Sequence, residues 1–210
     1  MEISRFYRIS SICRASDGIV FAKCCRQGGK DNLMTKKVKN NVTAGSFCVP
    51  PYHSDGKYNS TLEERIKRTP KENAIRGMWT GNRGESWYIP TNKSIIDILH
   101  IFELEGILYK AGIPDFSVCA KVTVSIENMN EIRRENFRKC DIKCAEIWSR
   151  EKYEGKSRWT PSDVKQWRKE NGYTWHERND MVICDLVPTK INRFFGHLGG
   201  VSECKKYRMI

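Results

Sequence analysis

Side chains that bind metals or exchange protons are concentrated near the C-terminal end of the chain. His176 and His197 flank this segment, and Glu177, Asp185 and Asn192 lie between them. Imidazole exchanges a proton near neutral pH, and divalent cations bind imidazole, amide and carboxylate ligands. The group therefore predicts a site in which one divalent cation and one general base activate water. Spacing alone leaves a structural alternative, in which His176 ends a strand and His197 ends a helix.

The segment that carries these residues has the pattern of two strands between two helices. Thr160 is a good N-cap residue, Pro161 suits the first helical position, and Gly172 suits the end of the same helix. The pattern predicts helices at 161–171 and 188–195 and strands at 173–176 and 181–187. A β-hairpin followed by a helix is the framework of a ββα metal finger, so these elements suit the predicted chemistry.

One geometric objection concerns the predicted last helix. Asn192 and His197 are five residues apart, which is about 140° around a regular helix. Two side chains in that relation do not converge on one ion. They converge only if the helix ends or widens near Gly196, and otherwise only one of them is a ligand.

The rest of the chain predicts further helices and short strands. Thr61 and Glu64 have the spacing of a capping box, and Pro70 stops the helix that they begin. We therefore expect an α+β fold, in which preceding helices and a small sheet support the C-terminal finger. Residues 1–70 form a basic N-terminal region of unassigned fold in this interpretation, and residues 71–210 form the second domain. The remaining predicted elements are strands at 86–89, 106–110 and 118–126, helices at 92–104 and 131–148, and a turn at 111–115.

Composition favours a partner with many negative charges. The chain has 210 residues, of which 37 are Lys or Arg and 25 are Asp or Glu, and its formal net charge is +12. Residues 1–70 carry 13 basic and 6 acidic side chains, and residues 71–210 carry 24 and 19. A basic surface attracts phosphate groups and releases counterions from nucleic acid. The alternative is a lysine-rich surface with no polyanionic partner.

The sequence predicts neither a membrane span nor a signal peptide. The longest apolar stretch, 94–102, is interrupted by Asp97 and His100, whereas a spanning helix needs about 20 apolar residues. Residues 1–12 have no apolar core of the kind that directs secretion. The nine cysteines include no Cys-x-x-Cys pair, so we expect reduced thiols rather than a zinc knuckle. These features predict a protein made in the cytoplasm.

Several short sequence motifs, taken in their order along the chain, resemble those of a known family. They are Gly172-Tyr-Thr-Trp-His-Glu, Leu186-Val-Pro-Thr-Lys-Ile-Asn and Phe195-Gly-His-Leu-Gly-Gly-Val, and upstream Arg83-Gly-Glu-Ser, Tyr88-Ile-Pro and Gly112-Ile-Pro-Asp-Phe-Ser. This combination resembles the C-terminal nuclease domain of bacterial polymorphic toxins, within the HNH/endonuclease VII superfamily. The resemblance covers roughly residues 76–204, about 60% of the chain. The usual family form has Trp-His-His where this chain has Trp175-His176-Glu177.

The resemblance implies a role for each candidate residue. His176 and Glu177 match the place that supplies the general base and part of the metal site. We expect His176 to be the activating imidazole and Glu177 to be a ligand or an orienting carboxylate, and the alternative is the reverse, with His176 on the metal. Asp185 falls near the central Asn of the HNH pattern, which braces the loop by hydrogen bonding, so the brace is altered here. Asn192 and His197 match the positions that hold the metal. Basic residues close to the finger in sequence are candidates for phosphate contacts, namely Lys190, Arg193, Lys205, Lys206 and Arg208.

The implied protein is a metal-dependent HNH-type endonuclease that hydrolyses phosphodiester bonds. One divalent cation is expected, and Mg²⁺, Mn²⁺, Ni²⁺ and Zn²⁺ each suit a set of His, Asn and carboxylate ligands. The expected substrate is DNA rather than RNA, and the expected partner is a cognate acidic immunity protein. A secretion system would then deliver the protein to the cytoplasm of a target cell. The alternative is a non-catalytic nucleic-acid-binding protein with a degenerate HNH finger.

Overall fold

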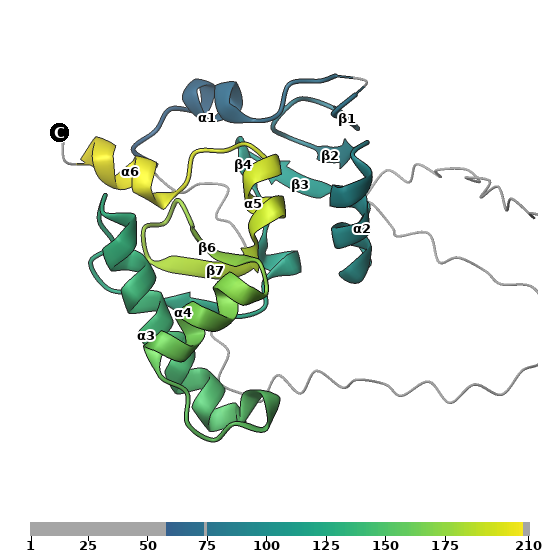
Figure 1. Ribbon diagram of the computed structural model, residues 1–210. Helices are drawn as coiled ribbons and strands as arrows, with labels where there is room; N and C mark the ends of the chain where they lie inside the picture. Colours follow the sequence, from purple (N-terminus) through teal and green to yellow (C-terminus); the bar gives the residue numbers. More distant parts are fainter. Residues whose placement is uncertain (1–57, 74, 208–210) are drawn as a thin grey trace, which may run out of the picture. The chain divides into compact units, whose positions relative to one another are not determined.

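The computed structural model describes residues 58–73 and 75–207, and it shows the mixed α+β fold that the sequence predicts (Figure 1). Within this part of the chain, every helix is too short or too polar to cross a membrane. The helices are α1 (Leu62–Arg68), α2 (Lys93–Ile101), α3 (Arg133–Glu151), α4 (Pro161–Glu170), α5 (Thr189–Phe194) and α6 (Gly200–Tyr207), with 3₁₀ turns at Ser117–Cys119 and Tyr153–Gly155. The strands are β1 (Gly77–Trp79), β2 (Trp87–Pro90), β3 (Ile107–Lys110), β4 (Ile113–Pro114), β5 (Thr123–Ser125), β6 (Tyr173–Glu177) and β7 (Ile183–Pro188).

The first sheet is an antiparallel meander in the order β1-β2-β3-β4. Tyr88 pairs with Ile107 across β2 and β3, and Tyr109 pairs with Pro114 across β3 and β4. The β3–β4 hairpin turns at Ala111 and Gly112, which both have positive φ angles, 49° and 72°, as two-residue hairpin turns require. The predicted turn at 111–115 is therefore shorter than expected, and its second half forms β4.

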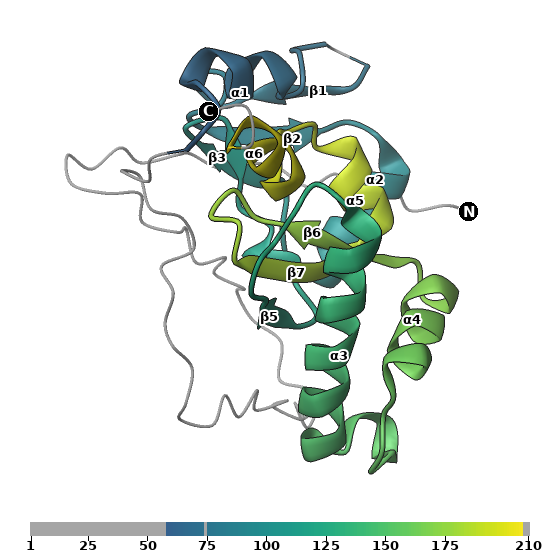
Figure 2. The ribbon, with the colours of Figure 1, turned by 90° about the vertical axis from the view of Figure 1, so that its left-hand side faces the viewer.

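The second sheet contains the predicted hairpin. Its order is β5-β7-β6, and His176 on β6 lies opposite Asp185 on β7. Helices α3 and α4 lie side by side along one face of this sheet (Figures 1 and 2). Apolar side chains fill the space between them, chiefly Val124, Trp175, Cys184 and Leu186 from the sheet and Cys140, Cys144 and Trp148 from α3.

The opposite face of the second sheet packs against α5. Here Val187 of β7 joins Ile191 and Phe195 in one apolar cluster with Tyr88 and Ile107 of the first sheet. Helix α5 contacts α2, β6 and β7. The two sheets are therefore joined through the helix that completes the predicted finger.

The predicted helix starts are confirmed, but one strand prediction is too long and one helix was missed. Thr61 with Glu64, and Thr160 with Asp163, form the reciprocal hydrogen bonds of capping boxes. The expected strand at 118–126 is a strand only at Thr123–Ser125, because a 3₁₀ turn occupies Ser117–Cys119. Helix α6 was not predicted, because Gly199 and Gly200 suggested only an end to the preceding helix.

The residues that precede α1 are joined to α6 by a buried carboxylate. Glu203 is fully buried, and it accepts hydrogen bonds from the backbone N and the Oγ of Ser60. It also accepts one from Nδ2 of Asn179, at 2.8 Å. Nε of Arg65 donates to the backbone oxygen of Ala111 at 2.7 Å. Residues 58–70 thus contact the later part of the chain closely, while the rest of the basic N-terminal region lies outside the described residues.

Candidate active site

The fold brings the two predicted histidines together. The ring centroids of His176 and His197 are 4.8 Å apart, and the rings are nearly perpendicular at 74°. Phe116 packs edge-on against both rings, with centroid distances of 4.8 Å to His176 and 5.3 Å to His197. Residues that are 21 positions apart in the sequence therefore form one cluster, which extends the hydrophobic core toward the surface.

The end of α5 removes the geometric objection to this pairing. The helix ends at Phe194, and Phe195 has φ −84° and ψ 91°, outside the helical region. Tyr109 then donates a hydrogen bond from its hydroxyl to the backbone oxygen of Gly196, at 3.1 Å. A Cβ atom at Gly196 would lie 2.5 Å from the backbone oxygen of Arg68, so only glycine fits there. His197 consequently leaves the helical path and turns back toward His176.

Burial keeps both imidazoles neutral. Desolvation lowers the pKa of His176 well below its usual 6.5, and the neighbouring His197 and Arg178 lower it further. Desolvation also lowers the pKa of His197 to about 4, although the residue as a whole is partly exposed. Nδ1 of His197 lies 2.7 Å from the backbone oxygen of Phe195. Because a carbonyl only accepts, this contact places the proton on Nδ1 and leaves the lone pair on Nε2.

Two buried polar atoms at this cluster have no hydrogen-bond partner. They are Nε2 of His176 and Oδ1 of Asn192. The Asn192 side chain lies within hydrogen-bonding reach of His176 and raises its pKa, but the two atoms do not meet the geometric criteria for a hydrogen bond. Buried polar atoms are nearly always paired in proteins, so unpaired ones point to a missing partner such as a water or an ion.

These atoms suit a divalent cation. Imidazole nitrogen and amide oxygen are ligands that borderline and hard cations accept. In the part of the chain that the structure describes, no group of three or more His, Cys, Asp or Glu side chains is arranged to hold a metal. A metal held here would therefore draw on imidazole and amide ligands, with water or substrate completing its coordination.

Glu177 is not brought to the histidine pair. Successive side chains of a strand point to opposite faces of the sheet, and the carboxylate of Glu177 points toward α3. It lies 3.3 Å from Nε of Arg133 and accepts a 3.3 Å hydrogen bond from Nδ2 of Asn136. Burial raises its pKa, and Arg133 partly opposes this shift.

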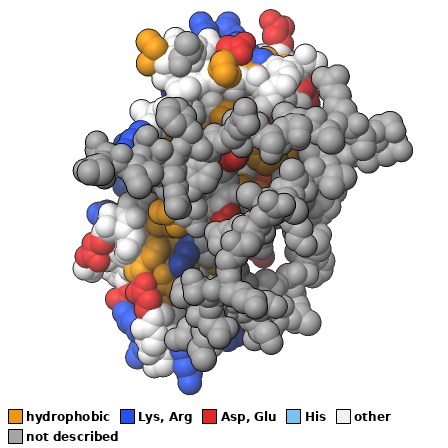
Figure 3. All heavy atoms as spheres, turned by 90° about the vertical axis from the view of Figure 1, so that its right-hand side faces the viewer, with side chains coloured by type: hydrophobic (Ala, Val, Ile, Leu, Met, Phe, Trp, Pro, Cys, Tyr) orange, Lys and Arg blue, Asp and Glu red, His pale blue; other side chains and the backbone are white. Residues whose placement is uncertain are grey.

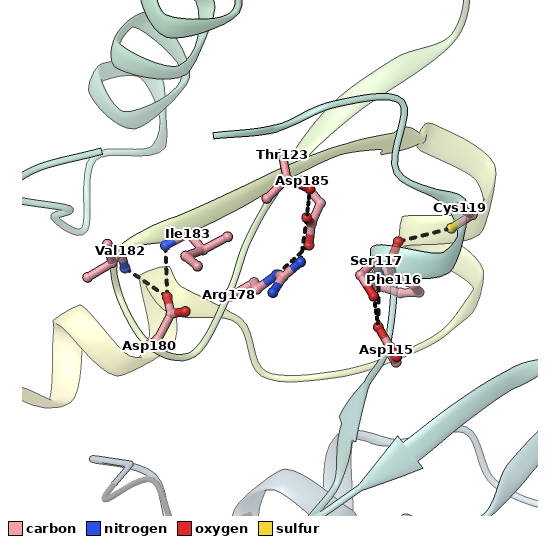
Figure 4. Close-up of polar contacts among 10 residues, drawn as sticks. All are labelled: Asp115, Phe116, Ser117, Cys119, Thr123, Arg178, Asp180, Val182, Ile183 and Asp185. Atoms are coloured by element: carbon pink, nitrogen blue, oxygen red, sulfur yellow. Dashed lines mark hydrogen bonds and ion pairs between the residues drawn. The ribbon is translucent and has the colours of Figure 1, made fainter. Parts of the chain in front are cut away.

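Asp185 lies on the same face as His176 but is fully engaged. Its carboxylate accepts hydrogen bonds from Nε and an NH₂ group of Arg178, at 2.6 and 2.7 Å, and from Oγ1 of Thr123 at 2.7 Å (Figure 4). Asp180 accepts from the backbone N of Val182 at the adjacent turn. Asp185 thus braces the hairpin by joining β5 and β7 to the turn after β6, and both of its oxygens are engaged.

Of the five basic residues that the sequence offers as phosphate contacts, three are exposed, one is already paired and one lies outside the described residues. Lys190 and Arg193 are exposed on α5, and Lys205 is exposed on α6. Nζ of Lys206 lies 2.6 Å from a carboxylate oxygen of Glu64, so its charge is already paired. Arg208 lies outside the described residues. Basic and acidic side chains lie beside each other where they are visible in Figure 3.

Sequence reasoning missed Phe116, Arg133 and Arg178, which surround the histidines. Phe116 belongs to the family-like word Gly112–Ser117, but its apolar type suggested only core packing. Arg133 and Arg178 had no distinguishing signal, because each is one of many basic residues in this chain. Two other residues of family-like words have a structural role here. Arg83 donates to Oγ1 and the backbone oxygen of Thr69, and Trp175 donates to a buried carboxylate on α3.

Comparison with known proteins connects this cluster to a nuclease family. A search of curated proteins finds no match to the chain. Residues 106–199, slightly less than half of the 210 residues, match the family model described as the DNase/tRNase domain of colicin-like bacteriocin. The matched segment includes both histidines, Asn192, Glu177 and Asp185. This part of the chain is therefore similar to a bacteriocin nuclease domain that acts on nucleic acid.

Proposed function

We propose that this protein is a metal-dependent HNH-type endonuclease that hydrolyses phosphodiester bonds of DNA as a bacterial toxin. One observation carries the proposal. Within a segment similar to bacteriocin nucleases, two neutral histidines and an asparagine meet with unpaired polar atoms. Neutral imidazole both binds metals and accepts protons.

The roles follow from which atoms are free. His197, with its lone pair on Nε2, and Asn192, through Oδ1, would hold one divalent cation. A bound cation would stabilise negative charge on the phosphate and the leaving oxygen. His176 then accepts a proton from the attacking water through its unpaired Nε2, and Phe116 holds its ring in place. Asp185 acts indirectly by fixing the hairpin that carries His176.

A toxin of this kind requires protection of the cell that makes it. We propose that a cognate acidic immunity protein binds the chain, because carboxylates facing a basic surface accelerate association by electrostatic steering. The chain would be made in the cytoplasm and delivered by a secretion system to the cytoplasm of a competing cell.

Purified protein incubated with plasmid DNA and with RNA tests the enzymatic proposal. Mg²⁺, Mn²⁺, Ni²⁺ and Zn²⁺ are each added after chelation with EDTA. Cleavage is expected only with a divalent cation, and on DNA in preference to RNA. Full cleavage in excess EDTA would contradict the metal site, and binding without cleavage under every condition would favour a nucleic-acid-binding protein with a degenerate finger.

His176→Ala is the matched site variant. Loss of a general base is expected to slow cleavage by ~10²–10⁴, with the folded state retained by circular dichroism. His100→Ala is the control, because His100 is exposed on α2. Equal activity of the two variants would place the site elsewhere.

Growth of a bacterium that expresses the chain tests the toxin proposal. Induction of the wild-type chain is expected to degrade cellular DNA and stop growth, whereas His176→Ala is tolerated. Unimpaired growth with both proteins would contradict a toxin that acts inside cells.

A further inference from the structure

Arg133 borders the histidine cluster, although it comes from a different element. It is the first residue of α3, and its Nε lies 3.3 Å from the carboxylate of Glu177, the residue after His176. Gly199 lies between the backbone of Glu177 and the ring of His197. A Cβ atom there would lie 2.9 Å from the backbone oxygen of Glu177 and 3.7 Å from Nε2 of His197. The positive charge of Arg133 also lowers the pKa of both histidines, which agrees with this proximity.

Arg133 is held in place and still exposed. Its side chain is 62% exposed, whereas that of Glu177 is 2% exposed. The guanidinium also lies over the ring of Phe137, with 5.9 Å from its carbon to the ring centroid. A carboxylate on one side and an aromatic ring on another restrict the rotamers of a side chain that is otherwise flexible. An arginine that is fixed before binding loses less conformational entropy when it contacts a ligand.

The contact with Glu177 leaves most of the guanidinium available. It uses Nε, whereas the two terminal nitrogens carry four further N–H donors. Those donors form a planar fork that matches two oxygens of a phosphate group. In a protein with a formal net charge of +12, the ligand that suits such a group beside two neutral histidines is a phosphate of a nucleic-acid backbone.

The same contacts give Glu177 a task other than proton transfer. Its carboxylate is 2% exposed and has Arg133 on one oxygen and Nδ2 of Asn136 on the other. It lies on the face of β6 opposite to His176. A general base must be within hydrogen-bond reach of the water that it deprotonates, and this carboxylate instead faces α3.

We propose that Arg133 contacts a phosphate of the substrate backbone, and that Glu177 is the positioning residue that holds Arg133 there rather than the general base. This inference rests on the proposed nuclease function for its substrate. It also decides between the two residues that the sequence left as candidates for the base, in favour of His176.

Binding measured without cleavage tests the role of Arg133. A labelled short DNA duplex is titrated with protein in EDTA by fluorescence anisotropy, at several salt concentrations. Arg133→Ala is expected to weaken binding by about 10-fold, since a hydrogen bond to a charged group is lost. It should also reduce the log–log salt slope by ~0.9.

Arg134→Ala is the charge-matched control, because Arg134 is the next residue and is exposed on the same helical turn. It removes the same charge and should change affinity much less than Arg133→Ala. Equal losses from the two variants would overturn the proposal, because they would show only the effect of net charge. Arg133→Lys keeps the charge without the fork, so its affinity should fall between those of the wild type and Arg133→Ala.

Glu177→Gln tests the positioning role. The amide keeps an acceptor for Asn136 but loses the ion pair, so binding should weaken in the wild-type background. In the Arg133→Ala background the same change should have no further effect on binding, because nothing is left to position. The pH profile of cleavage should keep its shape. Normal binding with abolished cleavage and a lost ionisation would instead make Glu177 the base and overturn the proposal.

The two proposals fail in different ways. If the wild-type protein cleaves nothing with any divalent cation, the proposed nuclease function fails, but the binding comparison in EDTA still judges Arg133. If cleavage occurs and Arg133→Ala binds and cleaves like Arg134→Ala, the inference fails and the nuclease function stands.

Discussion

Strand β6 separates two buried polar clusters that differ in one respect. On the α3 side, Trp175 donates to Oδ1 of Asp141 at 2.8 Å, and Arg168 of α4 donates to both oxygens of that carboxylate at 2.8 and 2.9 Å. On the α5 side, the neighbouring His176 and Asn192 each have a buried polar atom without a partner. One cluster is fully paired, and the other is not.

Whether a buried polar side chain has a hydrogen-bond partner distinguishes structural from functional residues here better than the residue type does. A paired buried carboxylate with two partners joins three elements and fixes how they pack. An unpaired buried nitrogen or oxygen costs free energy, so it calls for a partner such as a water or a bound ion. Trp175 and His176 are adjacent in one family-like sequence word, yet they belong to different clusters with different tasks. We expect the first cluster to respond to mutation through stability and the second through activity.

Loss of Asp141 should have the largest effect on stability. Asp141→Ala leaves the guanidinium of Arg168 buried without its carboxylate and is expected to lower the free energy of unfolding by about 3–5 kcal/mol. Urea unfolding followed by circular dichroism measures this. The double variant Asp141→Leu/Arg168→Met removes both charges and should recover most of the loss. If the single variant lowered the free energy of unfolding by less than about 1 kcal/mol, the Asp141 cluster would not have the structural role that we assign to it.

Asn192→Leu should show the opposite pattern. It removes one of the proposed metal contacts, so cleavage should fall by about 100-fold or more. Because Oδ1 has no partner, the free energy of unfolding should change little or rise. Calorimetric titration with Mn²⁺ should show weaker metal binding in the variant. Strong destabilisation with normal cleavage would mean that the atom is paired after all.

Trp175→Phe sharpens the assignment of the paired cluster. The ring is kept, but the hydrogen bond from Nε1 to Asp141 is lost, and we expect a loss of about 2 kcal/mol because the acceptor is charged. Cleavage by the remaining folded protein should be nearly normal. A large change in the cleavage rate at unchanged stability would show that the two faces of β6 are coupled.

Thr160→Ala should have the smallest effect, because it acts only on the exposed start of α4. Loss of an N-cap costs about 1 kcal/mol. The partner carboxylate, Asp163, has its pKa lowered from 3.8 to about 2, first by the Thr160 side chain and then by Lys156. A lowered pKa means that its contribution is complete above pH 3.8 and is lost as the pH falls toward 2. Thermal unfolding of the wild type and Thr160→Ala should therefore converge over that interval.

The sequence was most informative where local chemistry decides the structure. The capping box at Thr61, the N-cap at Thr160, the helix from Pro161 and the β6–β7 hairpin were predicted because N-cap residues, proline, glycine and alternating apolar residues act within a few positions. The pairing of β5 beside β7 was not predicted, because it depends on contacts between residues about 60 positions apart. Helix α6 was missed because its first residue, Gly200, is a poor helix former.

The candidate site was only partly predictable for the same reason. His176, Asn192 and His197 were identified by residue type together with the resemblance to a nuclease family, and the structure brings them together. The separation of Glu177 from His176 follows from strand alternation, which the resemblance to the Trp-His-His pattern obscured. The contacts of Arg133 and Arg178 depend on α3 and on the hairpin, and no local pattern distinguishes them from other arginines.

The buried carboxylate of Glu203 has a consequence for how this protein can be divided. A fragment restricted to the bacteriocin-like stretch at 106–199 would omit Glu203 together with α6. A fragment starting at residue 71 would keep Glu203 and remove Ser60, which supplies two of its hydrogen bonds. The candidate site residues thus lie within a shorter stretch of the chain than the residues whose contacts hold the fold together. A folded fragment of this chain would therefore have to include the longer stretch.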